Sequence, residues 1–273
     1  MQKVARMNSN FFIVFSLPRC GSTAIHRGLN SHSGINCLYE PDFSNADWNE
    51  EAVRAEINRI RCEYSGIKHV WDPSGFPFVS THISSIAGLD SNYDRVLNLN
   101  SMLLSLPAKK VLFLRRRNQL ERILSDLLGQ QTDLWGPAFP DARIAEGLDE
   151  TKKYQDELKA KRVQPVSLEV IEWYLNNIPT LEDELRRRVP EEDCLDLFYE
   201  EIFGPEVGLD RRLAIYQRIL DFLGLPTAPS YWDRPTVMEL FHPKAKLNDA
   251  STLGRIPNLA EVRERFQNRS LTL

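Results

Sequence analysis

One stretch near the start of the chain, NFFIVFSLPRCGSTAIHRGL, constrains the fold more than any other. It begins with a continuous apolar run from Phe11 to Phe15, and such a run of β-branched and aromatic residues is typical of a strand buried on both faces. The proline that follows ends the run, because proline cannot donate a ladder hydrogen bond. Gly21 permits a tight turn, and Ser22 and Thr23 are good N-caps for an amphipathic helix. The sequence therefore predicts a strand, a tight loop and a helix.

The loop between this strand and helix is predicted to bind an anion. Backbone N–H groups in the first turn of a helix have no acceptor within the helix, and the helix dipole adds partial positive charge. Arg19 contributes a full charge, and Ser22 and Thr23 contribute hydroxyl donors. We expect the Cys20 thiol to fill space rather than to act as a nucleophile. The loop differs from the P-loop of nucleoside triphosphatases, G-x-x-x-x-G-K-[ST], because it is shorter and lacks the lysine before the hydroxyl pair.

The composition narrows the class of protein. The formal net charge of the 273-residue chain is −4, so no overall basic field points to a nucleic-acid partner. No apolar stretch approaches the roughly 20 residues that span a bilayer, and the first residues lack a signal-peptide apolar region. The four cysteines include no C-x-x-C pair, which argues against structural zinc and gives no sign of a disulfide framework. We therefore expect a cytoplasmic protein.

The rest of the chain alternates between strand and helix patterns. Further strands are predicted at Gly66–Trp71, Arg95–Leu99, Lys109–Leu114 and Cys194–Phe198. Further helices are predicted at Asn49–Arg61, Ile83–Leu89, Gln119–Leu128 (ended by Gly129), Ser167–Val189, Leu209–Leu223 and from about Asn258. This alternation predicts an α/β fold of three layers, with a central, mainly parallel sheet flanked by helices and ligands at the carboxyl ends of its strands. Residues 132–165 break the pattern, and we expect them to form a surface excursion that could cover a substrate.

Two segments together resemble the sulfotransferases that use 3′-phosphoadenosine 5′-phosphosulfate. F-S-L-P-R-C-G-S-T is similar to the phosphosulfate loop of the bacterial and carbohydrate-type enzymes, P-R-S-G-[ST]-[ST]. R-N-Q-L-E-R-I-L-S places Arg117 and Ser125 at the spacing of the family's 3′-phosphate residues. G-I-K-H-V-W is similar to the strand that carries an active-site lysine, here Lys68, and L-F-Y-E-E-I is similar to Y-E-D-L. The resemblance extends from the first strand to Ile202.

The resemblance implies a P-loop-like type of fold, a single sulfotransferase-like domain over residues 1–273, and a role for each matching residue. The 5′-phosphosulfate is expected at the loop amides and at Arg19, Cys20, Gly21, Ser22 and Thr23. Arg117 and Ser125 are expected to bind the 3′-phosphate. Arg255, or Lys246, is expected to replace the absent R-K-G loop of the cytosolic enzymes. Lys68 and Arg19 are expected to assist the chemistry without a metal ion, because a sulfuryl group carries less charge than a phosphoryl group.

The general base is where the chain departs from the cytosolic enzymes. These carry K-x-H on the second strand, whereas here Lys68 is followed by His69 and then Val70, so His69 is expected on the opposite side of the strand from Lys68. The bacterial and heparan-type enzymes use a glutamate shortly after the first helix, and Y-E-P-D-F puts Glu40 there. Glu40 is therefore the expected base.

Two other functions remain open at this stage. A small-molecule kinase would need a lysine after Gly21 and a metal-holding aspartate after a strand, and the sequence offers neither. A non-catalytic nucleotide-binding module would keep Arg19, Arg117 and Ser125 without needing Glu40 or Lys68. The sequence leaves the acceptor open as well, although the glutamate-type site favours a hydroxyl of a carbohydrate or another small metabolite over a phenol.

Overall fold

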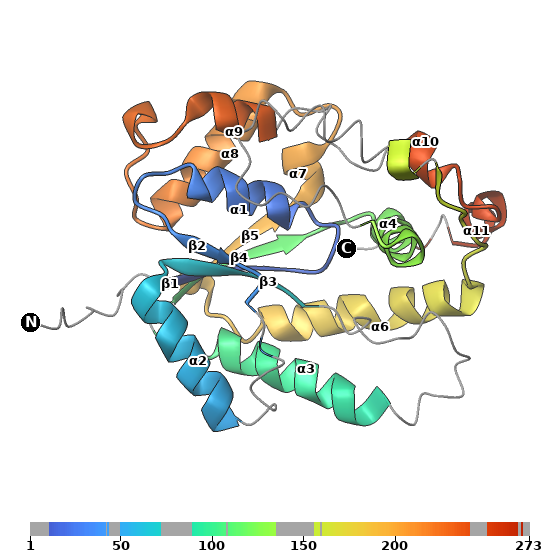
Figure 1. Ribbon diagram of the computed structural model, residues 1–273, viewed down its shortest axis with the longest axis horizontal. Coiled ribbons are helices and arrows are strands. Elements are labelled where there is room, and N and C mark those ends of the chain that lie inside the picture. Colours follow the sequence, from blue (N-terminus) through green and yellow to red (C-terminus); the bar gives the residue numbers. More distant parts are fainter. Residues whose placement is uncertain are drawn as a thin grey trace, which may run out of the picture.

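The computed structural model describes residues 11–41, 43, 50–71, 89–107, 109–134, 156–158, 160–240, 250–266 and 269. Its centre is a five-stranded, all-parallel sheet with the order β2-β3-β1-β4-β5 (Figure 1). The strands are β1 (Phe11–Ser16), β2 (Cys37–Tyr39), β3 (Gly66–Val70), β4 (Lys109–Arg115) and β5 (Cys194–Phe198).

The strand β1 occupies the middle of the sheet. All six of its residues are buried, as expected for a continuous apolar run that is covered on both faces. It pairs with β3 on one side and β4 on the other, so that Val14 lies opposite Lys68 and Leu112. Because all strands run the same way, the segments that follow β1, β3, β4 and β5 meet at one edge of the sheet, which we call the carboxyl edge.

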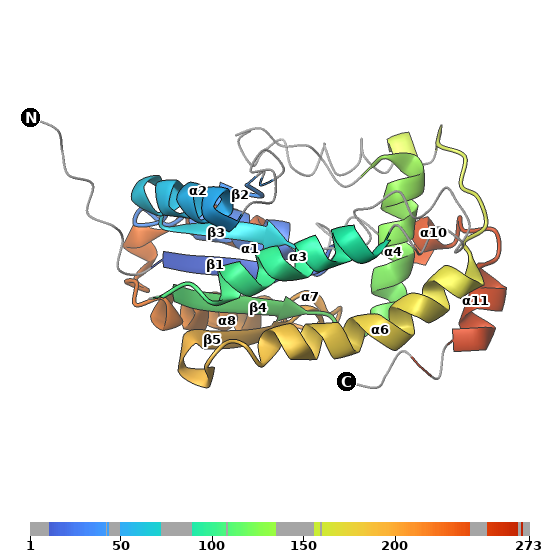
Figure 2. The same ribbon diagram turned by 90° about the horizontal axis from the view of Figure 1, so that it is seen from below.

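Helices cover both faces of the sheet (Figures 1 and 2). One layer is formed by α1 (Ser22–Asn30), α7 (Tyr199–Phe203), α8 (Leu209–Phe222) and α9 (Arg234–Leu240). The other is formed by α2 (Glu50–Glu63), α3 (Leu89–Leu104) and α6 (Leu168–Arg186). The helix α4 (Gln119–Thr132) stands beyond the carboxyl edge, with α10 (Ala250–Leu253) beside it, and α11 (Leu259–Phe266) lies next to the start of α6 (Figure 2). The three-layer α/β prediction with a parallel sheet is confirmed.

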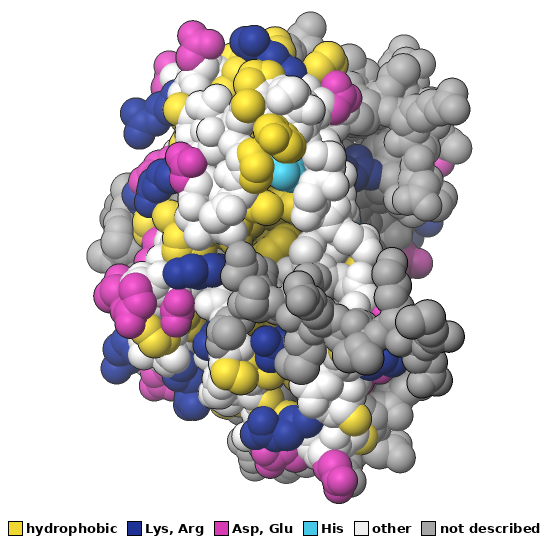
Figure 3. All heavy atoms as spheres, turned by 90° about the vertical axis from the view of Figure 1, so that its left-hand side faces the viewer, with side chains coloured by type: hydrophobic (Ala, Val, Ile, Leu, Met, Phe, Trp, Pro, Cys, Tyr) yellow, Lys and Arg dark blue, Asp and Glu magenta, His cyan; other side chains and the backbone are white. Residues whose placement is uncertain are grey.

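The end of the molecule opposite the carboxyl edge carries no cluster of like charges among the described residues. Seen from the left-hand side of Figure 1, hydrophobic side chains form a band, and acidic and basic side chains are interspersed around it (Figure 3).

The hydrophobic core is one cluster of buried side chains that extends in sequence from Phe11 to Phe266. None of the described helices is long and apolar enough to cross a membrane.

Two local predictions are wrong. The expected strand at Arg95–Leu99 lies within α3, because Leu99 and Leu103 are both buried and recur at helical spacing. Gly129 does not end α4, which continues to Thr132 and stops where Asp133 takes a left-handed conformation (φ 57°). The structure also contains the short edge strand β2, which includes Tyr39 and is absent from the strands predicted above.

Some predictions fall wholly or partly on residues outside the described ranges. Of the excursion at residues 132–165, the structure describes 132–134, 156–158 and 160–165. The helix expected at Ile83–Leu89 and the alternative nucleotide contact Lys246 also lie outside the described residues, apart from Leu89, which begins α3. Ser167, where the longest helix is predicted to begin, is the N-cap of α6, since its side chain accepts from the Val170 N–H.

Candidate active site

The loop between β1 and α1 is built around Gly21. This residue is the N-cap of α1 with φ 84°, and its carbonyl accepts the first helical hydrogen bonds from Ala24 and Ile25 at 3.1 and 3.3 Å. The expectation that Ser22 or Thr23 caps the helix is therefore wrong, because both already lie within α1. A glycine is needed here for two reasons: its φ is positive, and a Cβ would overlap the ring of Phe203 in α7.

The two residues before Gly21 have contrasting environments. Cys20 is completely buried, and burial raises the pKa of its thiol to about 12. The thiol therefore stays protonated and fills space, as expected, and only the backbone of Cys20 can reach a ligand. Arg19 has φ 66°, and its Nε donates to Ser125 Oγ in α4 at 2.9 Å. This contact brings a residue of the expected 5′ site next to a residue of the expected 3′ site.

Lys68 lies in the middle of β3, and its side chain extends to the carboxyl edge on the side of the sheet that α1 covers. Its side chain is buried, with 1% of the residue exposed, and Nζ donates to Thr23 Oγ1 at 3.2 Å and to a carboxylate oxygen of Glu40. The Tyr39 ring covers the ammonium at 4.0 Å from its centroid. The Glu40 N–H donates to the Lys68 carbonyl at 3.0 Å, which fixes the backbone that presents the carboxylate. The structure thus brings together Thr23, Glu40 and Lys68.

Arg117 follows β4 at the same edge. Its guanidinium pairs with Glu201 and lies over the Phe198 ring, with Cζ 4.0 Å from the ring centroid. The neighbouring acid, Glu200, accepts instead from the main-chain N–H groups of Arg117 and Asn118, at 3.0 and 2.9 Å. A carboxylate at the start of α4 satisfies N–H groups there, and it anchors the segment that carries Arg117. The Y-E-E segment therefore positions the candidate 3′ site.

Arg116 lies beside the candidate site, although its sequence pattern does not single it out. Its guanidinium donates to the Arg19 carbonyl at 3.3 Å, pairs with Glu121 of α4 at 2.9 Å and lies 4.4 Å from the Tyr199 ring centroid. It therefore joins the β1–α1 loop to α4 and α7. The sequence contains three consecutive arginines at 115–117. Such a run does not indicate which of the three side chains contacts which loop.

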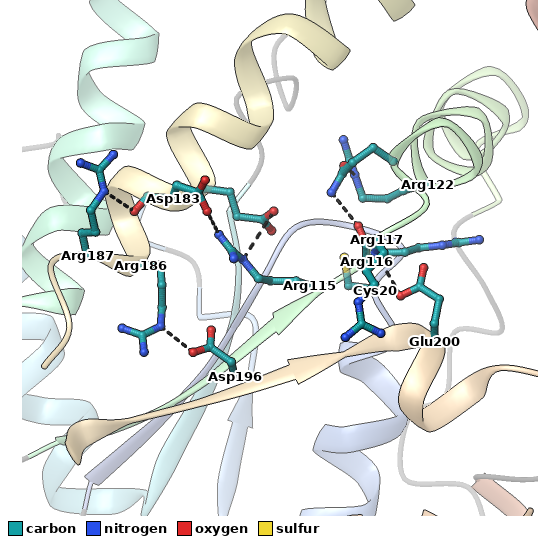
Figure 4. A network of polar contacts seen from close by, with 12 residues as sticks. Cys20, Arg115, Arg116, Arg117, Arg122, Asp183, Arg186, Arg187, Asp196 and Glu200 are labelled. Atoms are coloured by element: carbon teal, nitrogen blue, oxygen red, sulfur yellow. Dashed lines mark hydrogen bonds and ion pairs between the residues drawn. The ribbon is translucent and has the colours of Figure 1, made fainter. Parts of the chain in front are cut away.

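The three consecutive arginines point to different partners (Figure 4). Arg115 turns toward α6, where it pairs with Asp183 and lies 3.7 Å from the buried carboxylate of Glu182. Arg115 and Arg117 do not share one side of the sheet, because β4 ends at Arg115 and strand alternation does not extend to Arg117. Burial raises the pKa of Glu182 to about 7, with Arg115 as the nearest opposing charge.

His69 lies on the other face of the sheet from Lys68, as predicted. Its Nε2 is 2.7 Å from Asn100 Oδ1 in α3, and since an amide oxygen only accepts, Nε2 carries a proton. Burial lowers the pKa of His69 to about 4. A neutral histidine that is hydrogen-bonded to α3 has a packing role. Of the two candidate bases, Glu40 is the one on the side of the sheet that carries the β1–α1 loop.

Backbone strain coincides with the candidate site. In the part of the chain that the structure describes, the non-glycine residues with positive φ are Arg19, Glu40 and Asp133. Asp133 ends a helix, where this conformation is common. The other two are candidate site residues, and such strain persists where the surroundings over-determine it, most often at functional sites.

Arg255 is engaged elsewhere. Its guanidinium donates to the backbone carbonyls of Leu158 and Lys161 and so ties the end of α10 to the chain before α6. Its expected contact with the nucleotide stays a prediction. Among the described residues, His, Cys, Asp and Glu side chains form no group of three that could hold a metal ion.

Gly21→Ala should lower the free energy of unfolding by about 2–5 kcal/mol. The alanine meets roughly 1–2 kcal/mol of left-handed backbone strain and about 1–3 kcal/mol of overpacking against Phe203. Gly224→Ala is the matched control, because Gly224 has φ 70° and its Cβ would meet no described atom within 4 Å beyond its own chain neighbours. It should show the backbone cost alone. Urea denaturation of both variants measures the difference, and equal losses would contradict the role given to Phe203.

His69→Asn should flatten the acid side of the stability curve. The folded pKa of about 4 lies below the unfolded value of 6.5, so the unfolded state binds the proton first, and stability is lost as pH falls through this interval. Between pH 7 and pH 5 the wild type should lose roughly 1–2 kcal/mol more than the variant. Urea denaturation at both pH values tests this, and parallel losses would contradict it.

Comparisons with known proteins identify no family for this chain. The sequence matches no protein-family model, and no curated protein matches it either. The candidate active site therefore rests on the geometry at the carboxyl edge.

Proposed function

We propose that this protein is a sulfotransferase with a P-loop-like fold, formed by a single domain over residues 1–273 and located in the cytoplasm. It would move the sulfuryl group of 3′-phosphoadenosine 5′-phosphosulfate to a hydroxyl of a carbohydrate or another hydroxylated metabolite. The observation that carries the proposal is the contact of Lys68 Nζ with both Thr23 and Glu40. It joins a cation, a hydroxyl of the first turn of α1 and a carboxylate beside the candidate anion loop.

The two ends of the nucleotide have separate candidate positions. The 5′-phosphosulfate would bind at the N-terminus of α1, where the loop amides, Ser22 and Thr23 offer donors. The 3′-phosphate would bind the planar fork of Arg117 with Ser125 beside it. The contact between Arg19 and Ser125 supports this assignment, because it means that the two positions are within the reach of two side chains, as one nucleotide requires.

The proposed reaction is a direct transfer. The acceptor oxygen attacks sulfur, a new sulfur–oxygen bond forms, and the bond between sulfur and the 5′-phosphate oxygen breaks, which leaves 3′-phosphoadenosine 5′-phosphate. Glu40 takes the proton of the acceptor hydroxyl. Lys68 and Arg19 neutralise the negative charge that develops on the leaving phosphate oxygen. Holding donor and acceptor together supplies much of the remaining rate enhancement.

Arg117→Ala should weaken the binding of 3′-phosphoadenosine 5′-phosphate by roughly 1.5–3 kcal/mol, the scale of a hydrogen bond to a charged group. Adenosine 5′-phosphosulfate lacks the 3′-phosphate, so its affinity should barely change. Isothermal titration calorimetry with both ligands measures the difference. If the two ligands lose the same affinity, Arg117 does not contact the 3′ end.

Glu40→Gln should lower the turnover number by about 10²–10⁴-fold, the usual contribution of a general base, because glutamine keeps the shape and removes the proton acceptor. Nucleotide affinity should stay nearly constant. The measurement is the transfer of ³⁵S-labelled sulfuryl from 3′-phosphoadenosine 5′-phosphosulfate to a panel of sugars and phenols, with calorimetry in parallel.

Two further assays separate the alternatives. His69→Asn is the control variant, and a loss of turnover confined to it would make the site closer to the cytosolic type. Transfer from γ-labelled ATP instead of the sulfuryl donor would indicate a kinase. Nucleotide binding without transfer to any acceptor would indicate a non-catalytic module.

A further inference from the structure

The candidate 3′-phosphate residue Arg117 already has an anionic partner. A guanidinium can receive ligands only at the edges of its plane, and Phe198 covers one face of this plane at 4.0 Å. Glu201 occupies the Nη2 edge. Both side chains are partly open to solvent, 41% exposed for Arg117 and 35% for Glu201, so an incoming ligand can reach the pair.

The two adjacent acids of α7 have different partners. Glu200 is bonded to main-chain N–H groups, whose positions belong to the fold. Glu201 is bonded to the Arg117 side chain, which is the group expected to meet the phosphate. Among the described residues, Glu201 is the one carboxylate paired with Arg117. A phosphate oxygen and a carboxylate oxygen make the same charge-assisted hydrogen bond to a guanidinium, so they compete for this edge.

We propose that Glu201 is a built-in competitor of the nucleotide 3′-phosphate for Arg117. The inference rests on the proposed function, because it takes that phosphate as the ligand of Arg117. The doubly charged phosphate displaces the singly charged carboxylate, whereas a 3′-hydroxyl cannot. Glu201 thus lowers the affinity for the product, 3′-phosphoadenosine 5′-phosphate, and speeds its release.

The test is Glu201→Gln. Glutamine keeps the length and an oxygen that can accept from Nη2, so the orientation of Arg117 is retained while the competing charge is removed. Glu201→Gln should bind 3′-phosphoadenosine 5′-phosphate about 2- to 5-fold more tightly than the wild type, the equivalent of a partly exposed ion pair. Its affinity for adenosine 5′-phosphate should be unchanged. Calorimetry gives both affinities, and stopped-flow displacement should show a correspondingly slower release of the bisphosphate.

Glu206→Gln is the matched control, because it removes the same charge from an exposed position just beyond α7. It should leave both affinities unchanged. The second comparison repeats Glu201→Gln in the Arg117→Ala background, where nothing is left to compete for and the gain should disappear. A gain of full size there would mean that Glu201 repels the phosphate directly, and the proposal would be wrong.

The outcomes separate this inference from the proposed function. If the wild type binds the bisphosphate more tightly than adenosine 5′-phosphate but Glu201→Gln binds it equally or more weakly, the competitor role is overturned and the proposed function stands. If the wild type does not distinguish the two nucleotides, the assigned 3′ site is wrong, and both proposals fall together.

Discussion

The guanidinium of Arg116 makes the contacts on which the arrangement of the candidate site depends. It is nearly buried, with 5% of the residue exposed, and it reaches the Arg19 carbonyl, Glu121 and the Tyr199 ring at once. Charge-assisted hydrogen bonds of this kind are strong where water is excluded. They hold the first loop of the chain against elements that lie far along the sequence from it. Without this contact, the left-handed backbone of Arg19 would have one restraint fewer.

Lys68 carries a charge inside a buried strand of the central sheet. An unpaired ammonium at this depth would cost several kcal/mol of desolvation. Glu40, Thr23 and the Tyr39 ring offset that cost, and Glu40 does so from a strained backbone conformation. A buried cation and a strained partner each break a local rule of folding. Such exceptions cluster where a protein binds or reacts.

The two adjacent acids that follow β5, Glu200 and Glu201, also have different roles. Glu200 completes the main-chain hydrogen bonding at the start of α4, and Glu201 pairs with the side chain of Arg117, which follows β4. Burial decides the behaviour of two other groups nearby. The Cys20 thiol and the Glu182 carboxyl both have raised pKa values, so neither behaves as an ordinary surface group.

Several elements could be predicted from sequence because their signals are local. The run from Phe11 to Phe15 has no polar residue to place in water, so a strand buried on both faces is its simplest solution. The helix boundary at Ser167 follows from a capping hydrogen bond between near neighbours. The strand prediction at Arg95–Leu99 is wrong because a short alternation also fits one face of a helix, and only packing on the sheet distinguishes the two periods.

The sequence by itself determined the strand–loop–helix, the residue types at the candidate site and the alternation that makes a parallel sheet. It determined that His69 and Lys68 lie on opposite faces, because the period of a strand is two. Only the tertiary structure decided that Lys68 meets Glu40 and Thr23, that Arg116 rather than Arg115 holds the first loop, and that Glu201 pairs with Arg117. The physical reason is that these contacts join segments far apart in the chain, and their geometry depends on strand order and on where each strand ends.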